Sequence, residues 1–260
     1  MNTAPLDFTT IDGLRCAQAV AGEGAPLLLL HGWGAEIKLV WPLAERLVAL
    51  GYRVYALDLP GFGQSAPPPA AWSVHDYAAF VVKYLDHHGL EQVNLFGHSF
   101  GGRLGLLLGA EQAGRIRKMA LADSAGVRPK PAPSAQLRLK TYKAALNLLN
   151  GIGLKAQAEQ VRAWYSGRYG SADYQAVSGV MRETFVKVVN EDLLPYAARV
   201  RVPTLLFWGD QDADTPLWQG KLLEQTIPDA GLVVWEGAGH YSYLERLAET
   251  ARVMHHFFNG

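Results

Sequence analysis

The order of the short apolar runs restricts the fold of this chain more than any other feature. These runs occupy residues 26–30, 53–57, 93–96, 119–122, 204–208 and 232–235, and each ends at glycine or a polar residue. Runs of this kind are typical of buried parallel strands. Helical spacing of apolar residues, as at residues 43–50 and 77–85, fills the gaps between them. Strands that alternate with helices predict βαβ units and an α/β fold with a mostly parallel, doubly wound sheet.

Two segments depart from this alternation. Residues 6–20 precede the first βαβ unit, and we expect them to supply one or two antiparallel edge strands. Residues 127–200, called the insertion below, contain no strand-like run, whereas helical spacing recurs at residues 137–149 and 177–189. We predict that the insertion is a helical cap or lid, and that residues 1–126 and 201–260 form the core domain.

The insertion is basic, with 11 Lys and Arg against 5 Asp and Glu. The charges either form a solvated face or attract anionic substrates, and the sequence leaves both interpretations open. Its many Leu, Tyr and Val residues, with Trp164 and Tyr165 near its centre, are expected mostly to pack the cap onto the core. Some of them should line an apolar pocket beside Trp33 and Phe100.

The pentapeptide GHSFG at residues 97–101 follows one predicted strand and precedes a predicted helix at residues 102–110. In a G-x-S-x-G turn the backbone of the serine is strained, and the residues two before and two after it must be small. The turn lifts the serine hydroxyl above the sheet, next to a helix N-terminus whose free N–H groups favour an oxyanion. Ser99 is therefore the candidate nucleophile.

A serine hydroxyl becomes a good nucleophile only when a base removes its proton. Among the eight histidines, His240 follows a predicted strand and the flexible sequence GAG at residues 237–239. A loop at that position can reach over the sheet to a serine on a central strand. His31 is expected to hold its own loop, and the side chain of His98 to point away from the serine oxygen. His240 is thus the candidate base.

The base needs a carboxylate that fixes its tautomer and stabilises the imidazolium. Asp210, Asp212 and Asp214 follow the run at residues 204–208, and Asp123 follows the run at residues 119–122. The chain order of serine, acid and histidine permits all four.

A tetrahedral intermediate also needs two N–H donors for its oxyanion. The backbone N–H of Phe100, directly after the candidate nucleophile, is the first candidate donor. The second should come from the loop HGWG at residues 31–34, in which Trp33 is the natural candidate.

Together these motifs resemble the α/β-hydrolase superfamily, and within it the small bacterial esterase-like serine hydrolases. The resemblance covers nearly the whole chain and rests on five ordered segments: LLLHGWG at 28–34, DLPGFGQS at 58–65, GHSFGG at 97–102, WGDQDADTP at 208–216 and GAGH at 237–240. The fourth segment is similar to the family's acid loop, G-x-x-D-x-x-x-P. This match selects Asp212 as the triad acid, beside Ser99 and His240.

The resemblance implies a carboxylesterase-type enzyme that cleaves carboxylic esters of short to medium acyl length through an acyl-enzyme. An enzyme of this kind requires no metal and no organic cofactor. The sequence has no metal-ligand spacing such as H-E-x-x-H. A serine in the elbow disfavours the dehalogenases and epoxide hydrolases, and the absence of HGGG disfavours the hormone-sensitive lipase branch. Two alternatives stay open: a carbon–carbon bond hydrolase of dienoic ring-fission products, and a signalling receptor of this fold with slow turnover.

Composition narrows the partners and the compartment. Lys and Arg together number 24, as do Asp and Glu, so the formal net charge is zero, which argues against nucleic-acid partners and anionic membranes. Cys16 is the single cysteine, so an intrachain disulfide cannot form. The first residues lack the basic and apolar regions of a signal peptide, and the longest aliphatic run, residues 27–30, is far shorter than the roughly 18 residues of a membrane span. We expect a cytoplasmic protein with a small-molecule ester substrate.

Overall fold

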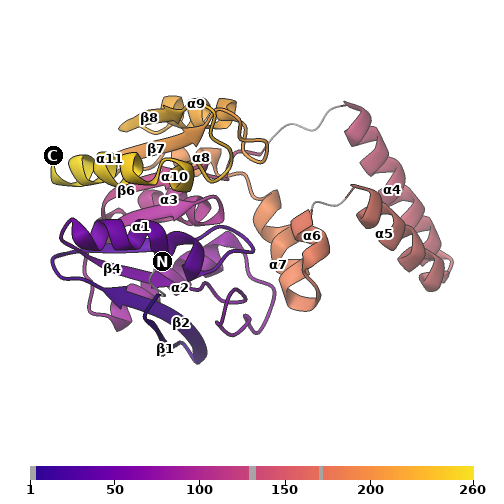
Figure 1. Cartoon of the computed structure of the whole chain (residues 1–260). Coiled ribbons are helices and arrows are strands. Elements are labelled where there is room, and N and C mark those ends of the chain that lie inside the picture. Colours follow the sequence, from indigo (N-terminus) through magenta and orange to yellow (C-terminus); the bar gives the residue numbers. More distant parts are fainter. Residues whose placement is uncertain (1–3, 129–132, 170–171) are drawn as a thin grey trace.

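The computed structural model describes residues 4–128, 133–169 and 172–260, and these form an eight-stranded sheet with helices on both faces (Figure 1). The strand order is β1-β2-β4-β3-β5-β6-β7-β8. The strands are β1 (Leu6–Ile11), β2 (Leu14–Ala21), β3 (Ala25–Leu30), β4 (Tyr52–Leu57), β5 (Val93–His98), β6 (Ile116–Ala122), β7 (Thr204–Gly209) and β8 (Ala230–Trp235). From β4 to β8 all neighbours are parallel, whereas β1 and β2 are antiparallel. The predicted fold class and the edge strands are confirmed.

The four leucines of β3 show how one strand serves two helical layers. Leu27 and Leu29 pack in a cluster with α1 (Ile37–Ala49) and α11 (Leu247–Asn259). Leu28 and Leu30 pack on the opposite face, in a cluster with α2 (Val74–His87), α3 (Phe100–Glu111) and α9 (Leu217–Thr226). All four leucines are buried, and burial of each side chain stabilises the fold by about 1.5–3 kcal/mol. A continuous apolar run is therefore what a central strand of this sheet requires.

Asp58 holds the turn between β4 and α2 against the start of α1. One carboxylate oxygen accepts the backbone N–H of Ile37, the first residue of α1, at 2.7 Å, and the other accepts that of Gln64 at 2.8 Å. The hydroxyl of Ser65 donates to the Asp58 carbonyl at 2.6 Å and accepts the N–H of Ala17 at 2.9 Å. This segment, DLPGFGQS, thus fixes where α1 begins and ties the turn to β2.

Between β6 and β7, in the predicted insertion, the described residues form five helices. They are α4 (Pro133–Gly151), α5 (Lys155–Tyr169), α6 (Ala172–Ala176), α7 (Gly179–Asn190) and α8 (Leu194–Ala197). In its described part, residues 127–128, 133–169 and 172–200, the insertion has no strand. Figure 1 shows α4 and α5 projecting away from the sheet, while α6 and α7 lie closer to it. The short helix α8 packs against α3 and α9, so the end of the insertion is part of the packed body.

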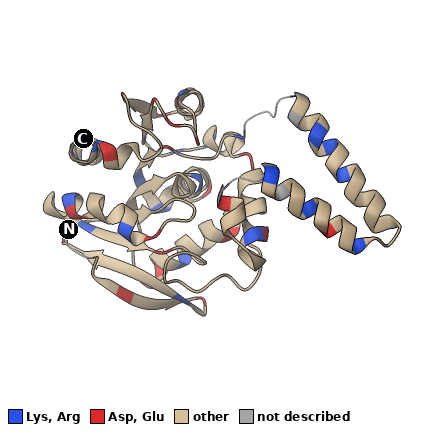
Figure 2. Ribbon diagram, turned by 45° about the vertical axis from the view of Figure 1, so that its right-hand side comes forward, with Lys and Arg blue, Asp and Glu red and all other residues tan. Residues whose placement is uncertain are grey.

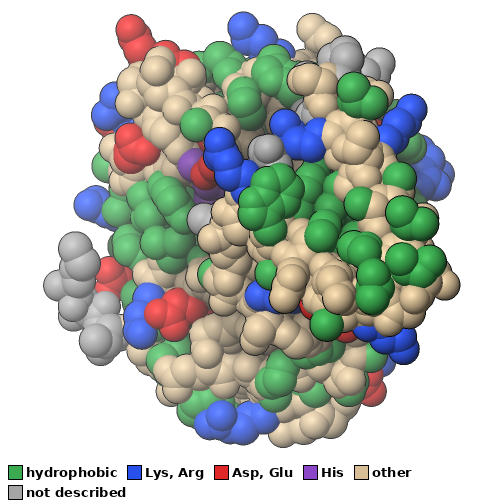
Figure 3. Space-filling model, turned by 90° about the vertical axis from the view of Figure 1, so that its right-hand side faces the viewer, with side chains coloured by type: hydrophobic (Ala, Val, Ile, Leu, Met, Phe, Trp, Pro, Cys, Tyr) green, Lys and Arg blue, Asp and Glu red, His purple; other side chains and the backbone are tan. Residues whose placement is uncertain are grey.

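The helices α4 and α5 do not pack onto the core in the way that we expected from their apolar residues. Tyr142 and Tyr165 stack on each other with ring centroids 3.9 Å apart, so the two helices bury apolar surface against one another. Other large side chains stay exposed, with 64% of Leu137, 65% of Leu148 and 64% of Trp164 accessible to solvent. Figure 2 shows Lys and Arg at intervals along both helices, and Figure 3 shows hydrophobic and basic side chains next to one another on the face from which the insertion projects. Among the described residues, no helix has the length and apolar character of a membrane span.

The contacts of Asp58 predict a large loss of stability on its removal. Asp58→Ala would leave buried N–H groups without acceptors and α1 without its N-terminal partner, so the free energy of unfolding should fall by about 2–4 kcal/mol in urea titrations. Asp86→Ala is the matched control, because its ion pair with Arg115 involves a carboxylate side chain that is 60% exposed, and exposed pairs contribute about 0–1 kcal/mol. Equal losses in the two variants would contradict this role of Asp58.

Candidate active site

Ser99 lies at the junction of β5 and α3 with a left-handed backbone, at φ 49° and ψ −104°. A non-glycine residue in this region costs about 1–3 kcal/mol, so the neighbouring structure must hold it. The N–H of Ser99 donates to the carbonyl of Ala122 at the end of β6, at 3.1 Å, and the N–H of Ala125 donates to the carbonyl of Ser99, also at 3.1 Å. The turn is therefore fixed from the adjacent strand.

The two outer glycines of the GHSFG turn have no room for a side chain. A Cβ atom on Gly97 would lie 2.5 Å from the carbonyl oxygen of Gly101, and a Cβ on Gly101 would lie 2.2 Å from that of Leu30. Real Cβ atoms do not approach backbone this closely, so larger residues would move β3, β5 or α3. The predicted need for small residues around Ser99 thus has a direct steric cause.

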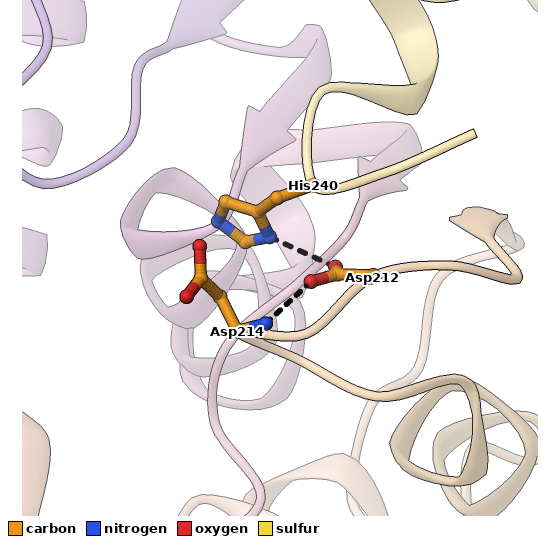
Figure 4. A group of neighbouring side chains, drawn as sticks. All are labelled: Asp212, Asp214 and His240. Atoms are coloured by element: carbon orange, nitrogen blue, oxygen red, sulfur yellow. Dashed lines mark hydrogen bonds and ion pairs between the residues drawn. The ribbon is translucent and has the colours of Figure 1, made fainter.

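Asp212 and His240 meet in a short hydrogen bond, with Nδ1 of His240 2.8 Å from Oδ2 of Asp212 (Figure 4). The Asp212 side chain is fully buried in the loop after β7, where it accepts the N–H groups of Asp214 at 2.8 Å and Thr215 at 2.9 Å. The Thr215 hydroxyl donates to it at 2.6 Å. Burial alone would raise the pKa of Asp212, but the hydrogen bonds from His240 and Thr215 outweigh it and hold the pKa below its ordinary value.

The hydrogen bond to Asp212 fixes the tautomer of the His240 ring. Because Nδ1–H donates to the carboxylate, Nε2 is the basic atom of the neutral ring. Burial would lower the pKa of His240, but the hydrogen bond and the charge of Asp212 raise it above its ordinary value. Ser99 and His240 line the same cavity. Among the described hydrogen bonds none joins their side chains, and such contacts often tighten only when substrate binds.

The other three aspartates that the sequence left open have different partners. Asp123 is fully buried and accepts the N–H of Gly209 at 2.9 Å and the hydroxyl of Ser242 at 2.6 Å; burial raises the pKa of its carboxyl to about 7. Asp210 accepts the N–H of Gly237 at 2.8 Å. Asp214 is exposed, and Figure 4 shows its carboxylate beside the His240 ring.

Asp212, Asp214 and His240 are also the described residues whose ligand atoms lie close enough together to hold a metal ion, within 4.8 Å. Each oxygen of Asp212 already accepts hydrogen bonds, and Nδ1 of His240 donates to one of them. A metal would compete with these bonds for the Asp212 carboxylate. The donor set therefore fits a carboxylate–imidazole pair better than a metal site.

The two predicted oxyanion donors lie beside Ser99. Trp33 and Phe100 both line the cavity, and within the described residues their backbone N–H groups have no protein acceptor. His31 positions the Trp33 loop, because its Nδ1–H donates to the carbonyl of Gly32 at 2.7 Å while Nε2 accepts the N–H of Leu59 at 3.0 Å. An oxyanion site requires N–H groups that are not already bonded to protein, and both residues meet this condition within the described part of the chain.

His98 contacts the loop that carries the candidate base, a role that the sequence did not predict. Its Nε2 lies 2.8 Å from the carbonyl oxygen of His240, and the two rings are 4.9 Å apart. Burial lowers the pKa of His98 to about 3, so the ring is neutral and donates from Nε2. Its place directly before Ser99 is the one sequence signal for this role.

The cavity has a volume of about 540 Å³. Its lining combines the core residues around Ser99 with loops after β6, β7 and β8, and with α6 and α7 of the insertion. It comprises Gly32, Trp33, His98, Ser99, Phe100, Arg103, Ala125, Gly126, Val127, Asp173, Phe185, Val188, Val189, Asp214, Thr215, Gln219, His240 and Tyr241. Trp33 packs edge-on against Phe185, with ring centroids 5.0 Å apart, so α7 closes one side of the site. Trp164 and Tyr165 are not part of this lining.

The hydrogen bond between Asp212 and His240 predicts how the pKa of His240 responds when the carboxylate is removed. In the folded protein its midpoint should lie above the ordinary value of about 6.5, because the Asp212 carboxylate stabilises the imidazolium. In Asp212→Asn that charge is gone while burial remains, so the midpoint should fall below the wild-type value. NMR titration of the ring protons measures both, and Asp210→Asn is the control that should not move it. An unchanged midpoint in Asp212→Asn would show that the carboxylate does not act on this ring.

Comparison with known proteins identifies the family of the chain. The chain is 28% identical over 266 residues to the dihydrolipoyllysine-residue acetyltransferase component of the acetoin cleaving system of Cupriavidus necator; the match covers 94% of this chain and only 66% of that protein. It is 27% identical over 247 residues to the pimeloyl-(acyl-carrier protein) methyl ester esterase of Chromobacterium violaceum, covering 90% and 94% of the two chains. The crystal structure of a membrane phospholipase A, a bacterial virulence factor, is similar with a TM-score of 0.75 and 26% identity, over 98% of this chain and 86% of that one. A family model described as alpha/beta hydrolase fold matches residues 25–247, and the chain belongs to this family.

Proposed function

We propose that the protein is a carboxylesterase-type serine hydrolase that cleaves esters of short to medium acyl length. The observation that carries the proposal is the hydrogen bond between Asp212 and His240, together with the place of His240 in the same cavity as Ser99. Trp33 and Phe100 line this cavity too, and their backbone N–H groups have no protein acceptor within the described residues. A nucleophile, an oriented base and two oxyanion donors are the parts that acyl transfer to water requires.

Each part has a defined role in the proposed reaction. The Ser99 oxygen attacks the ester carbonyl carbon while Nε2 of His240 takes the hydroxyl proton, and Asp212 stabilises the imidazolium. The N–H groups of Trp33 and Phe100 bind the oxyanion. Collapse of the tetrahedral intermediate breaks the bond to the alcohol, which leaves with the proton from His240. Water then attacks the acyl-enzyme by the same steps in reverse order, releasing the acid and free Ser99.

The cavity supports a small ester rather than a long lipid chain. Its volume of about 540 Å³ lies within the range of small-molecule sites, and Phe185, Val188 and Val127 supply apolar surface next to Ser99. An acyl chain gains about 0.8 kcal/mol per buried methylene until this space is filled. The names of two similar proteins, a methyl ester esterase and a phospholipase, agree with ester cleavage. We propose further that the insertion selects substrates through α6 and α7, because these helices contribute Asp173 and Phe185 to the lining.

A fluorophosphonate probe together with nitrophenyl esters tests the nucleophile. The wild type should be labelled once per chain and should hydrolyse nitrophenyl acetate and butyrate, with kcat/KM lower for octanoate once the cavity is full. Ser99→Ala should lose both labelling and hydrolysis, because no other activated hydroxyl is proposed. Cleavage of a dienoic ring-fission product without turnover of the esters would contradict the esterase proposal, as would labelling that persists in Ser99→Ala.

The identity of the acid is tested by comparing two buried aspartates. Asp212→Asn should lower kcat by about 10⁴, since the imidazole loses the partner that fixes its tautomer. Asp123→Asn should keep kcat within about tenfold of wild type but lower the free energy of unfolding by about 1–3 kcal/mol, because an amide cannot accept all the N–H and O–H groups around it. Steady-state kinetics and urea unfolding measure both effects. An inactive Asp123→Asn beside a nearly normal Asp212→Asn would assign the acid to the loop after β6.

A further inference from the structure

Arg103 lies one helical turn beyond Ser99 and lines the cavity. Its backbone N–H donates to the Ser99 carbonyl at 3.2 Å, the first hydrogen bond of α3. Arg103 and Ser99 thus line the same cavity, and only 7% of Arg103 is exposed.

The guanidinium of Arg103 has no carboxylate partner among the described residues. Nη1 donates to the backbone carbonyl of Glu191 at 2.9 Å, and this is the one hydrogen bond that the side chain makes to the described part of the chain. The Glu191 carboxylate instead pairs with Nε2 of His75 at 2.8 Å, and that of Asp192 accepts the N–H of Leu194 at 3.3 Å.

Such a charge is unusual in a protein interior. Burial lowers the pKa of Arg103 to about 10, so the side chain remains a cation at neutral pH. Buried charges are generally paired, because an uncompensated one is costly. Within the described residues most of the five N–H donors of Arg103 have no protein acceptor, and a carboxylate that enters the cavity would match their planar geometry.

The charges around the cavity indicate which part of a substrate this anion belongs to. In the proposed reaction His240 protonates the leaving alcohol, so the alcohol part lies beside this ring. Asp214 and Asp173 line the cavity together with the His240 ring. Burial and the charge of Asp214 raise the pKa of Asp173, whereas the charge of His240 lowers it. An anionic alcohol would meet repulsion there. Arg103 is the one Lys or Arg among the described residues that line the cavity, so its anion is better placed on the acyl part of the substrate. The charges of Glu191 and Asp192 stabilise the Arg103 cation, but neither carboxylate accepts a hydrogen bond from it within the described residues.

We propose that Arg103 binds the free carboxylate of a dicarboxylic acid half-ester, whose esterified end faces Ser99. This inference rests on the proposed esterase function and names its acyl component. The apolar side chains of Phe185 and Val188 line the same cavity and suit the methylene chain between the two ends. Water and the half-ester give the dicarboxylic acid and the alcohol through the Ser99 acyl-enzyme, with no further reactant.

The test compares matched charged and neutral methyl esters. The monomethyl esters of succinic, glutaric and adipic acid are paired with methyl butyrate, pentanoate and hexanoate, and release of methanol gives kcat/KM. In the wild type at least one half-ester should be preferred over its neutral partner. Arg103→Met should lower this preference by about tenfold to a hundredfold, the range expected for a hydrogen bond between charged groups. Arg103→Lys should retain part of it, because the charge stays while the planar fork is lost.

Arg182→Met is the matched control, since Arg182 is an exposed arginine of α7 outside the cavity lining. Arg182→Met should leave the preference for half-esters over neutral esters unchanged. If this preference falls as much in Arg182→Met as in Arg103→Met, the effect belongs to the general basic charge of the insertion and the proposal is overturned. A preference that survives Arg103→Met would overturn it too.

Binding separates this inference from the esterase proposal. Calorimetry should show that monomethyl glutarate binds to the Ser99→Ala variant. The affinity should fall at least tenfold in the double variant Ser99→Ala, Arg103→Met. Circular dichroism checks that both variants are folded. If the wild type hydrolyses no ester but this difference is found, the esterase proposal fails and the carboxylate site stands. If neutral esters are hydrolysed and binding does not depend on Arg103, the carboxylate site fails and the esterase proposal stands.

Discussion

The left-handed backbone of Ser99 is held by the strands on both sides of β5. The end of β6 accepts the Ser99 N–H through Ala122, and the residue after β3 accepts the Gly101 N–H through the carbonyl of His31, at 3.1 Å in both cases. These bonds exist because β3, β5 and β6 are adjacent and parallel, so their carboxyl ends meet at one edge. The same adjacency brings the Trp33 loop next to the N-terminus of α3. The geometry around Ser99 thus follows from the strand order.

Two buried carboxylates lie after neighbouring strands, yet their surroundings shift their pKa values in opposite directions. Asp212 follows β7 and contacts His240, which donates to it, so its pKa lies below the ordinary value. Asp123 follows β6, where burial raises its pKa to about 7 while Gly209 and Ser242 donate to it. The two charges also repel one another. One carboxylate therefore stays ionised beside the imidazole, while the other ties the loops after β7 and β8 together.

The sequence predicted those parts of the molecule that short segments encode. Apolar runs marked the strands, and the glycines around Ser99 marked the turn, because a left-handed serine between a strand and a helix leaves no space for side chains. It did not predict the bond from His98 to the His240 carbonyl or the bond from the Arg103 guanidinium to the Glu191 carbonyl, since both depend on residues about 90 to 140 positions away. The exposure of Trp164 was missed for a related reason, because helical spacing shows that a helix has an apolar face but not what covers it.

The position of the insertion between β6 and β7 bears on how this architecture can vary. These two strands are parallel neighbours whose pairing, from Met119 opposite Thr204 to Ala122 opposite Phe207, belongs to the sheet itself. Lengthening the connection between them adds little entropic cost, about 0.6 kcal/mol for each doubling of loop length. The segment can therefore grow, shrink or be exchanged over evolutionary time while the sheet keeps its register. Part of the cavity wall can thus be rewritten in a stretch of the gene that encodes neither Ser99 nor His240.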